Sequence, residues 1–342
     1  MTLLSEPLTP VPSAERPGVA DRLDLPEPPR RVPPVRRVQT CYALMHIAAG
    51  AGVRDFADGE YTESDTTLEE GIIRQNDYLL DEVGCTRPGF RLLEIGSGYG
   101  RLLRQARQRG AVGVGVNISP EQVRDCQEQG LEVHCCNYRD LMEAPEWQGR
   151  FDGVVANGSL EHWVQPEDVK AGQANAIYNE AFEIAQRMLD PQDADARFVT
   201  TAIHVPESLD PDALLTDWRR LPKGSSERMF SLLHHWFGGY YPTYTQLAEC
   251  AQPYFALEKQ TDGTTGYGAA SQYRMSRMRR ALATKPKVLW KIAQSLLRRP
   301  RRTSELLYAY FIAEAWDWQF RGETPPTRLL RQTWRRNATL AT

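Results

Sequence analysis

The sequence predicts an α/β fold in which a parallel sheet carries helices on both faces. Two observations support this prediction. Short apolar runs alternate with amphipathic segments from about residue 65 to residue 203, as they do in strand–helix–strand units. Polar or glycine-rich turns directly follow several of these runs, at the sheet edge where ligands bind in such folds. The 342 residues are 41% hydrophobic and 25% charged, a balance that allows a sizeable core.

Seven segments have the composition of strands. The first five alternate with helices, and the last two would complete a seven-stranded sheet whose order the sequence does not give. The predicted strands are residues 91–95, 112–116, 131–136, 151–156, 198–203, 254–261 and 267–275.

The predicted helices begin with capping patterns. Thr67 to Glu70 form a capping box that opens the helix before the first strand. Ser119 caps another helix, with Pro120 at its first position and Gln122 closing a second capping box. Residues 171–189 form a long helix before the fifth strand.

The chain divides into three predicted parts. Residues 1–40 hold nine prolines and few large apolar side chains, which predicts a flexible arm. Residues 41–280 form the ligand-binding domain, with a helical cap insertion at about 205–240 where the alternation breaks. Residues 281–342 form a basic and aromatic helical C-terminal extension.

The six cysteines lack the paired spacing of metal ligands, so we expect reduced thiols in the core and no metal site. No apolar run is long enough to span a membrane, and the N-terminus lacks the pattern of a secretory signal. We therefore expect a cytoplasmic protein. The net charge of -3 does not indicate nucleic-acid binding. The cysteines are Cys41, Cys85, Cys126, Cys135, Cys136 and Cys250.

The turn after the first strand has the strongest ligand-binding pattern. LLEIGSGYG, residues 92–100, places three glycines between a strand and a helix N-terminus, which favours an anionic group. A nicotinamide dinucleotide would call for a further glycine at Arg101 and an acid at Asn117. Glu94 before the first glycine fits S-adenosylmethionine better. A structural turn without a ligand is the remaining alternative.

Several segments together resemble the cyclopropane-fatty-acid and mycolic-acid cyclopropane synthases, a superfamily that includes plant benzylisoquinoline N-methyltransferases. The resemblance covers roughly residues 54 to 324 and implies the Rossmann-like fold of class I methyltransferases, with S-adenosylmethionine as cofactor. The matching segments, in family order, are YTESDTTLEEG (61–71), LLEIGSGYG (92–100), GVNISPEQ (115–122), NYRDL (137–141) and FDGVVANGSLEHW (151–163).

The resemblance implies a cofactor site built from the turns after the first three strands. The glycine turn would hold the methionine end of the cofactor, the turn at Asn117 its ribose, and Asn137 its adenine, in place of the family's aspartate. The implied residues are Glu94, Gly96, Ser97, Gly98, Gly100, Asn117, Ile118, Gln122 and Asn137.

The resemblance also implies catalytic residues. In the synthases a glutamate, a histidine and a tyrosine hold a bicarbonate that removes a proton as the ring closes; Glu161, His204 and Tyr267 match them. In the N-methyltransferases the pair matched by Glu161 and His162 orients the amine or takes its proton. One departure is Asp58, which replaces a family cysteine whose backbone helps to bind bicarbonate. A carboxylate at this position disfavours the binding of an anion such as bicarbonate.

Just before the acidic segment, Phe56 and Ala57 replace a tyrosine and a serine that touch the cofactor in the family. Five aromatic side chains follow the Glu-His pair or lie in the cap, where they would wall an acyl pocket or pack in the core. They are Trp163, Trp236, Phe237, Tyr240 and Tyr241.

A basic segment follows the main domain. Residues 271–304 hold eleven Lys or Arg residues and no acid, and apolar residues recur there at helical spacing. Such a helix either contacts an anionic membrane peripherally, through residues 274–302, or packs its apolar stripe on the domain. Residues 305–320 are apolar nearly all round, which predicts a helix that is buried or lies in a subunit contact. The stripe consists of Val288, Leu289, Ile292 and Leu296.

Four hypotheses follow. The chain methylates or cyclopropanates an unsaturated acyl chain of a lipid, or it is a small-molecule N- or C-methyltransferase that uses Glu161 and His162. Alternatively it binds the cofactor without catalysis, or it is a nicotinamide dehydrogenase. The sequence does not indicate an oligomeric state.

Overall fold

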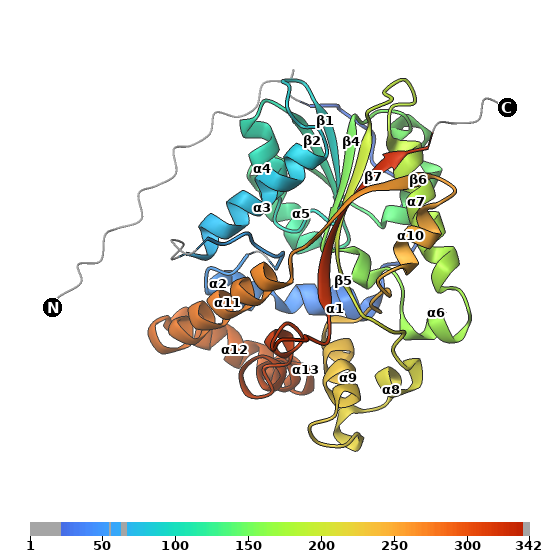
Figure 1. Cartoon of the computed structure of the whole chain (residues 1–342). Coiled ribbons are helices and arrows are strands. Elements are labelled where there is room, and N and C mark those ends of the chain that lie inside the picture. The colour runs from blue at the N-terminus through green and yellow to red at the C-terminus, as the bar shows by residue number, and fades with distance from the viewer. Residues whose placement is uncertain (1–21, 55, 63–66, 338–342) are drawn as a thin grey trace.

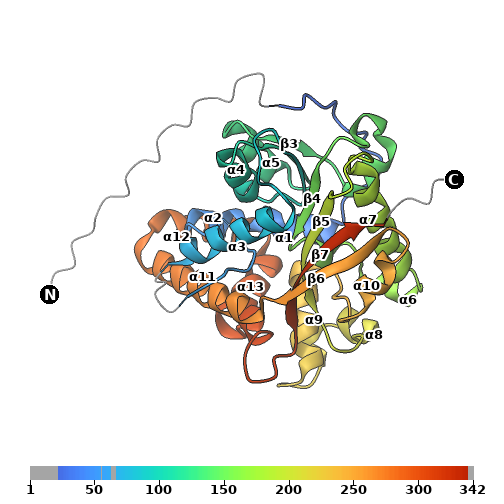
Figure 2. The same cartoon turned by 45° about the horizontal axis from the view of Figure 1, so that its top comes forward.

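The computed structural model describes residues 22–54, 56–62 and 67–337 and confirms the predicted α/β fold. One seven-stranded sheet has the order β3-β2-β1-β4-β5-β7-β6, in which β1 to β5 run parallel and β7 is antiparallel to both of its neighbours. Helices α3 and α4 cover one face and α7 and α10 the other (Figures 1 and 2). The strands are β1 Arg91–Ile95, β2 Val112–Asn117, β3 Glu132–Cys135, β4 Gly153–Asn157, β5 Arg197–His204, β6 Phe255–Asp262 and β7 Arg328–Arg336.

The helices around the sheet begin largely where the capping patterns place them. Thr67 and Glu70 form the predicted capping box of α3. Ser119 caps α5, but the second predicted capping box does not form, because the Gln122 side chain accepts a hydrogen bond from Asn117 Nδ2 (3.0 Å) instead. The helices are α3 Leu68–Glu82, α4 Arg101–Gln108, α5 Pro120–Glu128, α6 Pro166–Lys170, α7 Ala174–Met188 and α10 Gln246–Ala251.

The predicted seventh strand is wrong. Residues 267–275 lie inside helix α11 (Thr264–Thr284), whose buried side chains recur three or four residues apart. The seventh strand is β7, in the region predicted to be helical, and it lies between β5 and the edge strand β6. The sequence did not indicate β7 because its arginines are typical of an exposed segment. In the structure one of them, Arg331, is buried, and acidic partners from a distant segment neutralise its charge.

Part of the predicted flexible arm belongs to the domain. Residues 1–21 lie outside the described residues, as do residues 63–66 of the segment before α3. Residues 22–35 run along the domain, where the Pro26 carbonyl accepts a hydrogen bond from Trp147 Nε1 (2.9 Å) and Arg31 N–H donates to Asp140 (2.9 Å). Helices α1 (Arg36–Leu44) and α2 (His46–Gly50) follow. These contacts give the proline-rich segment a place to bury its apolar side chains.

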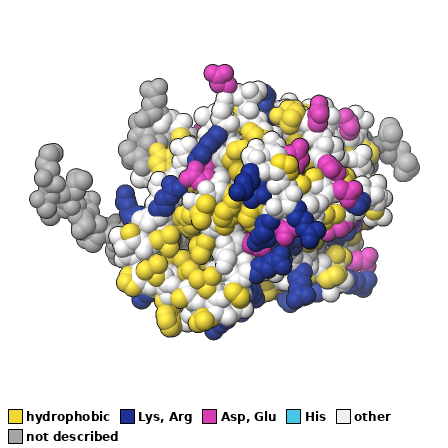
Figure 3. Space-filling view, turned by 90° about the horizontal axis from the view of Figure 1, so that it is seen from below, with side chains coloured by type: hydrophobic (Ala, Val, Ile, Leu, Met, Phe, Trp, Pro, Cys, Tyr) yellow, Lys and Arg dark blue, Asp and Glu magenta, His cyan; other side chains and the backbone are white. Residues whose placement is uncertain are grey.

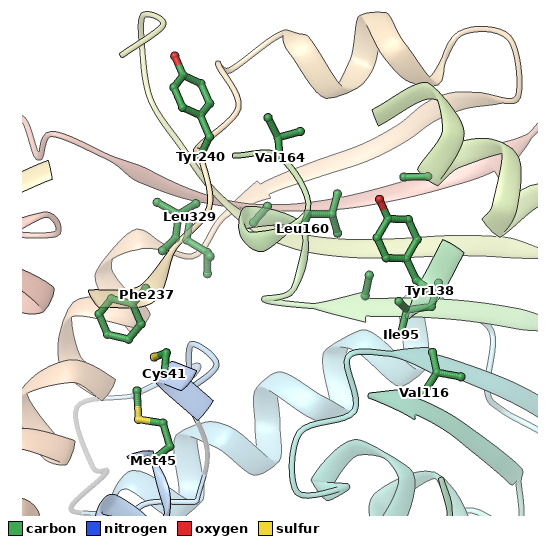
Figure 4. Packing of buried hydrophobic residues seen from close by; sticks show 14 of the residues in the cluster. Cys41, Met45, Ile95, Val116, Tyr138, Leu160, Val164, Phe237, Tyr240 and Leu329 are labelled. Carbon is green, nitrogen blue, oxygen red and sulfur yellow. The ribbon is translucent and has the colours of Figure 1, made fainter. Parts of the chain in front are cut away.

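The cap insertion contains α8 (Pro211–Leu215) and α9 (Ser226–Phe237). After α11 come α12 (Pro286–Arg298) and α13 (Pro300–Leu307), which lie near α9 at one end of the molecule (Figure 1). The predicted aromatic helix at 305–320 is broken into the end of α13, a π-helical turn Tyr308–Ile312 and α14 (Ala315–Trp318). One core cluster runs from the sheet into the cap, as Ile95, Leu160 and Phe237 show (Figure 4).

All six cysteines are free thiols, five of them buried. Within the described ranges, no group of His, Cys, Asp and Glu side chains is arranged to hold a metal ion. None of the helices that the structure describes is both long and apolar enough to cross a membrane.

Candidate active site

A single cavity opens beyond the carboxyl ends of β1, β2 and β4, where folds of this kind bind ligands. Helix α1, the loop residues Arg54, Phe56 and Ala57, the cap, α11 and α14 form its other walls. Every predicted site residue lines this cavity except Gly100 and His204. The predicted residues that do are Glu94, Gly96, Ser97, Gly98, Asn117, Ile118, Gln122, Asn137, Glu161, His162 and Tyr267.

The three glycines of the turn serve different purposes. All have positive φ, +84° at Gly96, +50° at Gly98 and +69° at Gly100, a region that side chains rarely adopt. A Cβ on Gly96 would lie 2.6 Å from the Ser159 Cβ, and one on Gly100 would lie 2.4 Å from Leu131. A Cβ on Gly98 would meet nothing within 4 Å. Gly100 therefore allows close packing, whereas Gly98 faces open space.

Asn117 holds the glycine turn in place. Its Nδ2 donates to the Gly98 carbonyl (3.2 Å) and to Gln122 (3.0 Å), and its Oδ1 accepts from the Ser119 N–H (3.1 Å). The amide thus links the turn after β1 to the turn after β2. The buried Ser97 hydroxyl beside it has no hydrogen-bond partner among the described residues.

A flat aromatic surface lies next to the turn after β3. Tyr138 and Trp163 stack with their ring centroids 4.0 Å apart and their planes 15° apart, and both line the cavity. Asn137 precedes Tyr138, and its Oδ1 accepts a hydrogen bond from the Arg139 N–H (3.1 Å). The same side chain forms a capping box with Asp140 at the start of the short helix Tyr138–Glu143.

Glu161 is the buried carboxylate in the turn after β4. The Ile203 N–H donates to its Oε1 (2.8 Å), while its Oε2 has no partner among the described residues. Burial raises the pKa of Glu161 to about 7. The cap packs directly on this turn, since the Tyr240 N–H donates to the Glu161 carbonyl (2.9 Å) and a Cβ on Gly239 would overlap that carbonyl.

His162 pairs with a residue that the sequence did not indicate. Its Nε2 lies 2.9 Å from the hydroxyl of Tyr42, which reaches the cavity from α1. Loss of solvation lowers the pKa of His162 to about 4, so the imidazole is neutral near pH 7. Val38, Tyr42 and Met45, which all line the cavity, recur at helical spacing, and this spacing is the signal that could have identified the cavity-facing side of α1.

His204 is not brought to the cavity. It is fully buried, and its Nδ1 lies 2.8 Å from the Ala202 carbonyl. Its neighbour Ile203 lines the cavity instead, because successive side chains of a strand point to opposite faces. Tyr267 does line the cavity, although from a helix, and its hydroxyl donates to the Phe56 carbonyl (2.7 Å).

Asp58 does not place its charge in the cavity, contrary to the expectation from the sequence. Its carboxylate binds Arg331 Nε (2.7 Å) and Nη2 (2.6 Å) from β7, and it is absent from the cavity wall. Burial still raises the pKa of Asp58 to about 6, despite the nearby guanidinium. Phe56 and Ala57, on the same loop, line the cavity.

The aromatic residues divide into two groups. Trp163, Phe237 and Tyr241 line the cavity, together with Trp316 of α14, which the sequence did not indicate. Trp236 and Tyr240 are buried elsewhere in the core. The cavity combines a turn suited to a cofactor with an aromatic wall and a buried carboxylate.

The chain matches a family model described as "Mycolic acid cyclopropane synthetase" over residues 54–224. It is 29% identical over 177 residues to a cyclopropane-fatty-acyl-phospholipid synthase of Escherichia coli, covering 50% of this chain but 37% of that protein. It is 34% identical over 104 residues to a tuberculostearic acid methyltransferase of Mycobacterium tuberculosis, covering 28% of this chain and 23% of that protein. The matches therefore span little more than a third of the first relative and less than a quarter of the second.

The fold is similar to that of solved cyclopropane synthases. A cyclopropane synthase from Mycobacterium tuberculosis superposes with a TM-score of 0.67 and 18% identity, over 90% of this chain and 100% of that one. A mycolic acid cyclopropane synthase in complex with SAH and CTAB superposes with a TM-score of 0.65 and 19% identity, over 90% and 99%.

Proposed function

The chain belongs to the mycolic acid cyclopropane synthetase family and has the fold of a class I methyltransferase, and we propose that it transfers a methyl group from S-adenosylmethionine to an unsaturated fatty acyl chain of a lipid. One observation carries this proposal. The glycine turn, Glu161 and the aromatic wall line the same cavity, and Glu161 Oε2 has no partner among the described residues, so a cofactor and an apolar substrate would meet beside a buried carboxylate.

The residues at the sheet edge fit the cofactor. Gly98 and Gly158 line the cavity, have positive φ and would meet nothing within 4 Å if they carried a Cβ, so both leave room for a ligand. The N-terminus of α4 and the unpartnered Ser97 hydroxyl suit a carboxylate. Asn117 and Asn137 line the cavity at the turns after β2 and β3, where the ribose and adenine ends would lie. The cofactor supplies an electrophilic methyl group when bound.

The aromatic wall would position the acyl chain and exclude water. Phe237, Tyr241 and Trp316 present ring faces or edges to the cavity, and aromatic faces attract a positive charge. Methylation of a double bond leaves such a charge on the neighbouring carbon. Loss of a proton from the added methyl closes a cyclopropane ring, and Glu161, the buried carboxylate on the cavity wall, would be the acceptor of that proton.

The direct test is incubation of the chain with S-adenosylmethionine and vesicles of a monounsaturated phospholipid, followed by mass spectrometry of the fatty acids. We expect a mass gain of one methylene. No gain in any lipid, with methylation of a soluble amine instead, would favour the small-molecule alternative, for which the neutral His162 beside Tyr42 is the supporting observation.

Turnover should rise with pH around the pKa of Glu161, which is about 7. The carboxyl must be ionised to accept a proton, so the rate is lost as the pH falls below this value. His162 contributes no second limb near neutrality, because its pKa is about 4. Initial rates at saturating substrate between about pH 5 and pH 9 measure the profile, and a flat profile would contradict the assignment of Glu161 as base.

Gly96→Ala should weaken S-adenosylmethionine binding by about tenfold or more, since a forced left-handed residue costs roughly 1–3 kcal/mol. The added Cβ would also clash with Ser159, which displaces the turn. Titration calorimetry measures the affinity. Gly89→Ala is the matched control, because Gly89 has a φ of +76° and open space around it but lies outside the cavity wall. Equal affinity in both variants would argue against a cofactor role for the turn.

A further inference from the structure

Helix α12 has two apolar faces, and the domain covers one of them. Val288 and Ile292, from the stripe that the sequence indicated, are buried, so this part of the stripe packs on the domain, whereas Leu289 of the same stripe is 50% exposed. A second set of apolar residues recurs at intervals of three or four along the opposite face. All five members of this set, which we call the α12 outer face, are exposed: Pro286, Leu289, Trp290, Ala293 and Leu297.

The outer face exposes large apolar side chains to an unusual degree. The exposed fractions are 50% for Leu289, 62% for Trp290 and 85% for Leu297. Figure 3, seen from below, shows apolar side chains gathered on the part of the surface where α12 and α13 lie, with Lys and Arg beside them. Contiguous apolar surface rimmed by charge marks an interaction site more often than a solvated helix.

The charges around the outer face are positive and uncompensated. Lys285 and Lys287 at the start of α12, and Arg298 and Arg299 at its end, are exposed, and none forms an ion pair with a described residue. The acidic partners nearby are already used. Glu314 pairs with Arg279 and Arg321, and Glu305 pairs with Arg219, Arg301 and Arg302.

The outer face lies one helix layer away from the cavity. Helix α12 packs on α2, where the Lys291 side chain lies against Gly50. Helix α2 follows Met45 directly, and Met45 and Tyr42 line the cavity. A surface bound by α12 would therefore hold this cavity wall close to it.

We propose that the α12 outer face docks on a bilayer that contains anionic phospholipids. Leu289, Trp290 and Leu297 enter the interface between headgroups and acyl chains, and the four flanking cations contact lipid phosphates. A second copy of the chain fits less well, because a symmetric contact through this face would bring the same cations together. The docking goes beyond the proposed methyl transfer and does not depend on it.

Co-sedimentation of the full chain with vesicles, without cofactor, tests the proposal. We expect binding to vesicles of equal parts phosphatidylglycerol and phosphatidylcholine to exceed binding to phosphatidylcholine alone by about tenfold or more, and to fall with added salt. The triple variant L289S, W290S, L297S and the quadruple variant K285Q, K287Q, R298Q, R299Q should each lose about tenfold or more of this binding.

Ile73→Ser is the control, because Ile73 is 43% exposed on α3, away from α12. Unchanged thermal unfolding of all variants would show that they are folded. Equal binding to both kinds of vesicle, or full binding by the triple variant, would overturn the proposal. So would a concentration-dependent dimer, seen without vesicles and lost in the triple variant, since the face would then join two copies. Methyl transfer measured separately distinguishes this failure from that of the proposed function.

Discussion

Glu161→Gln is expected to lower turnover by about 10²–10⁴-fold, the contribution of a positioned general base. The amide has the size of the carboxylate, and its oxygen can still accept the hydrogen bond that the Ile203 N–H donates to Oε1. What the amide loses is the ability of the carboxylate to take a proton. Single-turnover rates with S-adenosylmethionine and an unsaturated phospholipid measure the effect.

Cofactor affinity separates loss of chemistry from loss of structure. Glu161→Gln should bind S-adenosylmethionine as the wild type does, because the glycine turn and Asn117 are unchanged. It should also lose the pH dependence near 7 in any residual activity. Glu128→Gln is the matched control, since Glu128 is exposed on α5. Wild-type turnover in Glu161→Gln would show that the proton leaves by another route.

Arg331→Met is expected to lower the free energy of unfolding by about 3–5 kcal/mol near pH 7, because it removes one partner of a buried ion pair. Asp58 is 1% exposed and Arg331 is 6% exposed, so water cannot replace the lost partner. The loop that carries Asp58 also carries Phe56 and Ala57 of the cavity wall. The variant should therefore weaken ligand binding as well as the fold.

The pH dependence of this loss identifies its cause. Burial already holds the pKa of Asp58 at about 6, above its ordinary value, so ionisation of Asp58 costs folding stability as the pH rises. Without Arg331 this cost grows, and the deficit should be smaller near pH 5, where folded Asp58 is protonated, than near pH 7. Denaturant unfolding at both pH values measures it.

Two further variants complete the test. Asp58→Asn combined with Arg331→Met removes both charges and should recover most of the stability. Arg335→Met removes an exposed arginine from the same strand and should change stability little. A deficit in Arg331→Met that is independent of pH and remains in the double variant would mean that packing of the long side chain, rather than charge, is what matters.

Most of the fold that the sequence predicted rests on local signals. The capping box of α3, the N-cap of α5 and the first five strands depend on residues that are neighbours in the chain. β7 was missed because its arginines look exposed until Asp58 and Glu60, more than 270 residues away, are placed beside Arg331. The strand predicted at 267–275 was wrong because a short apolar and aromatic run does not distinguish the two periodicities.

The same distinction between local signals and contacts with distant residues applies to the candidate site. The glycine turn, Asn117 and Glu161 could be located because each directly follows a strand, and parallel strands bring their carboxyl ends together. His204 was misplaced because its facing depends on one step of strand alternation, which only the position of Ile203 on the cavity wall reveals. Tyr42 was missed because its partner His162 is 120 residues away.

By itself, the sequence determined the sheet-and-helix class, the position of the glycine turn and the acidic residue after β4, since these follow from turn chemistry and periodicity over a few residues. Only the tertiary structure decided which charges are paired, which face of α12 is left exposed and which side chains reach the cavity. Those outcomes depend on groups that are distant in the chain, because such groups decide whether a side chain is buried against a partner or left in contact with water.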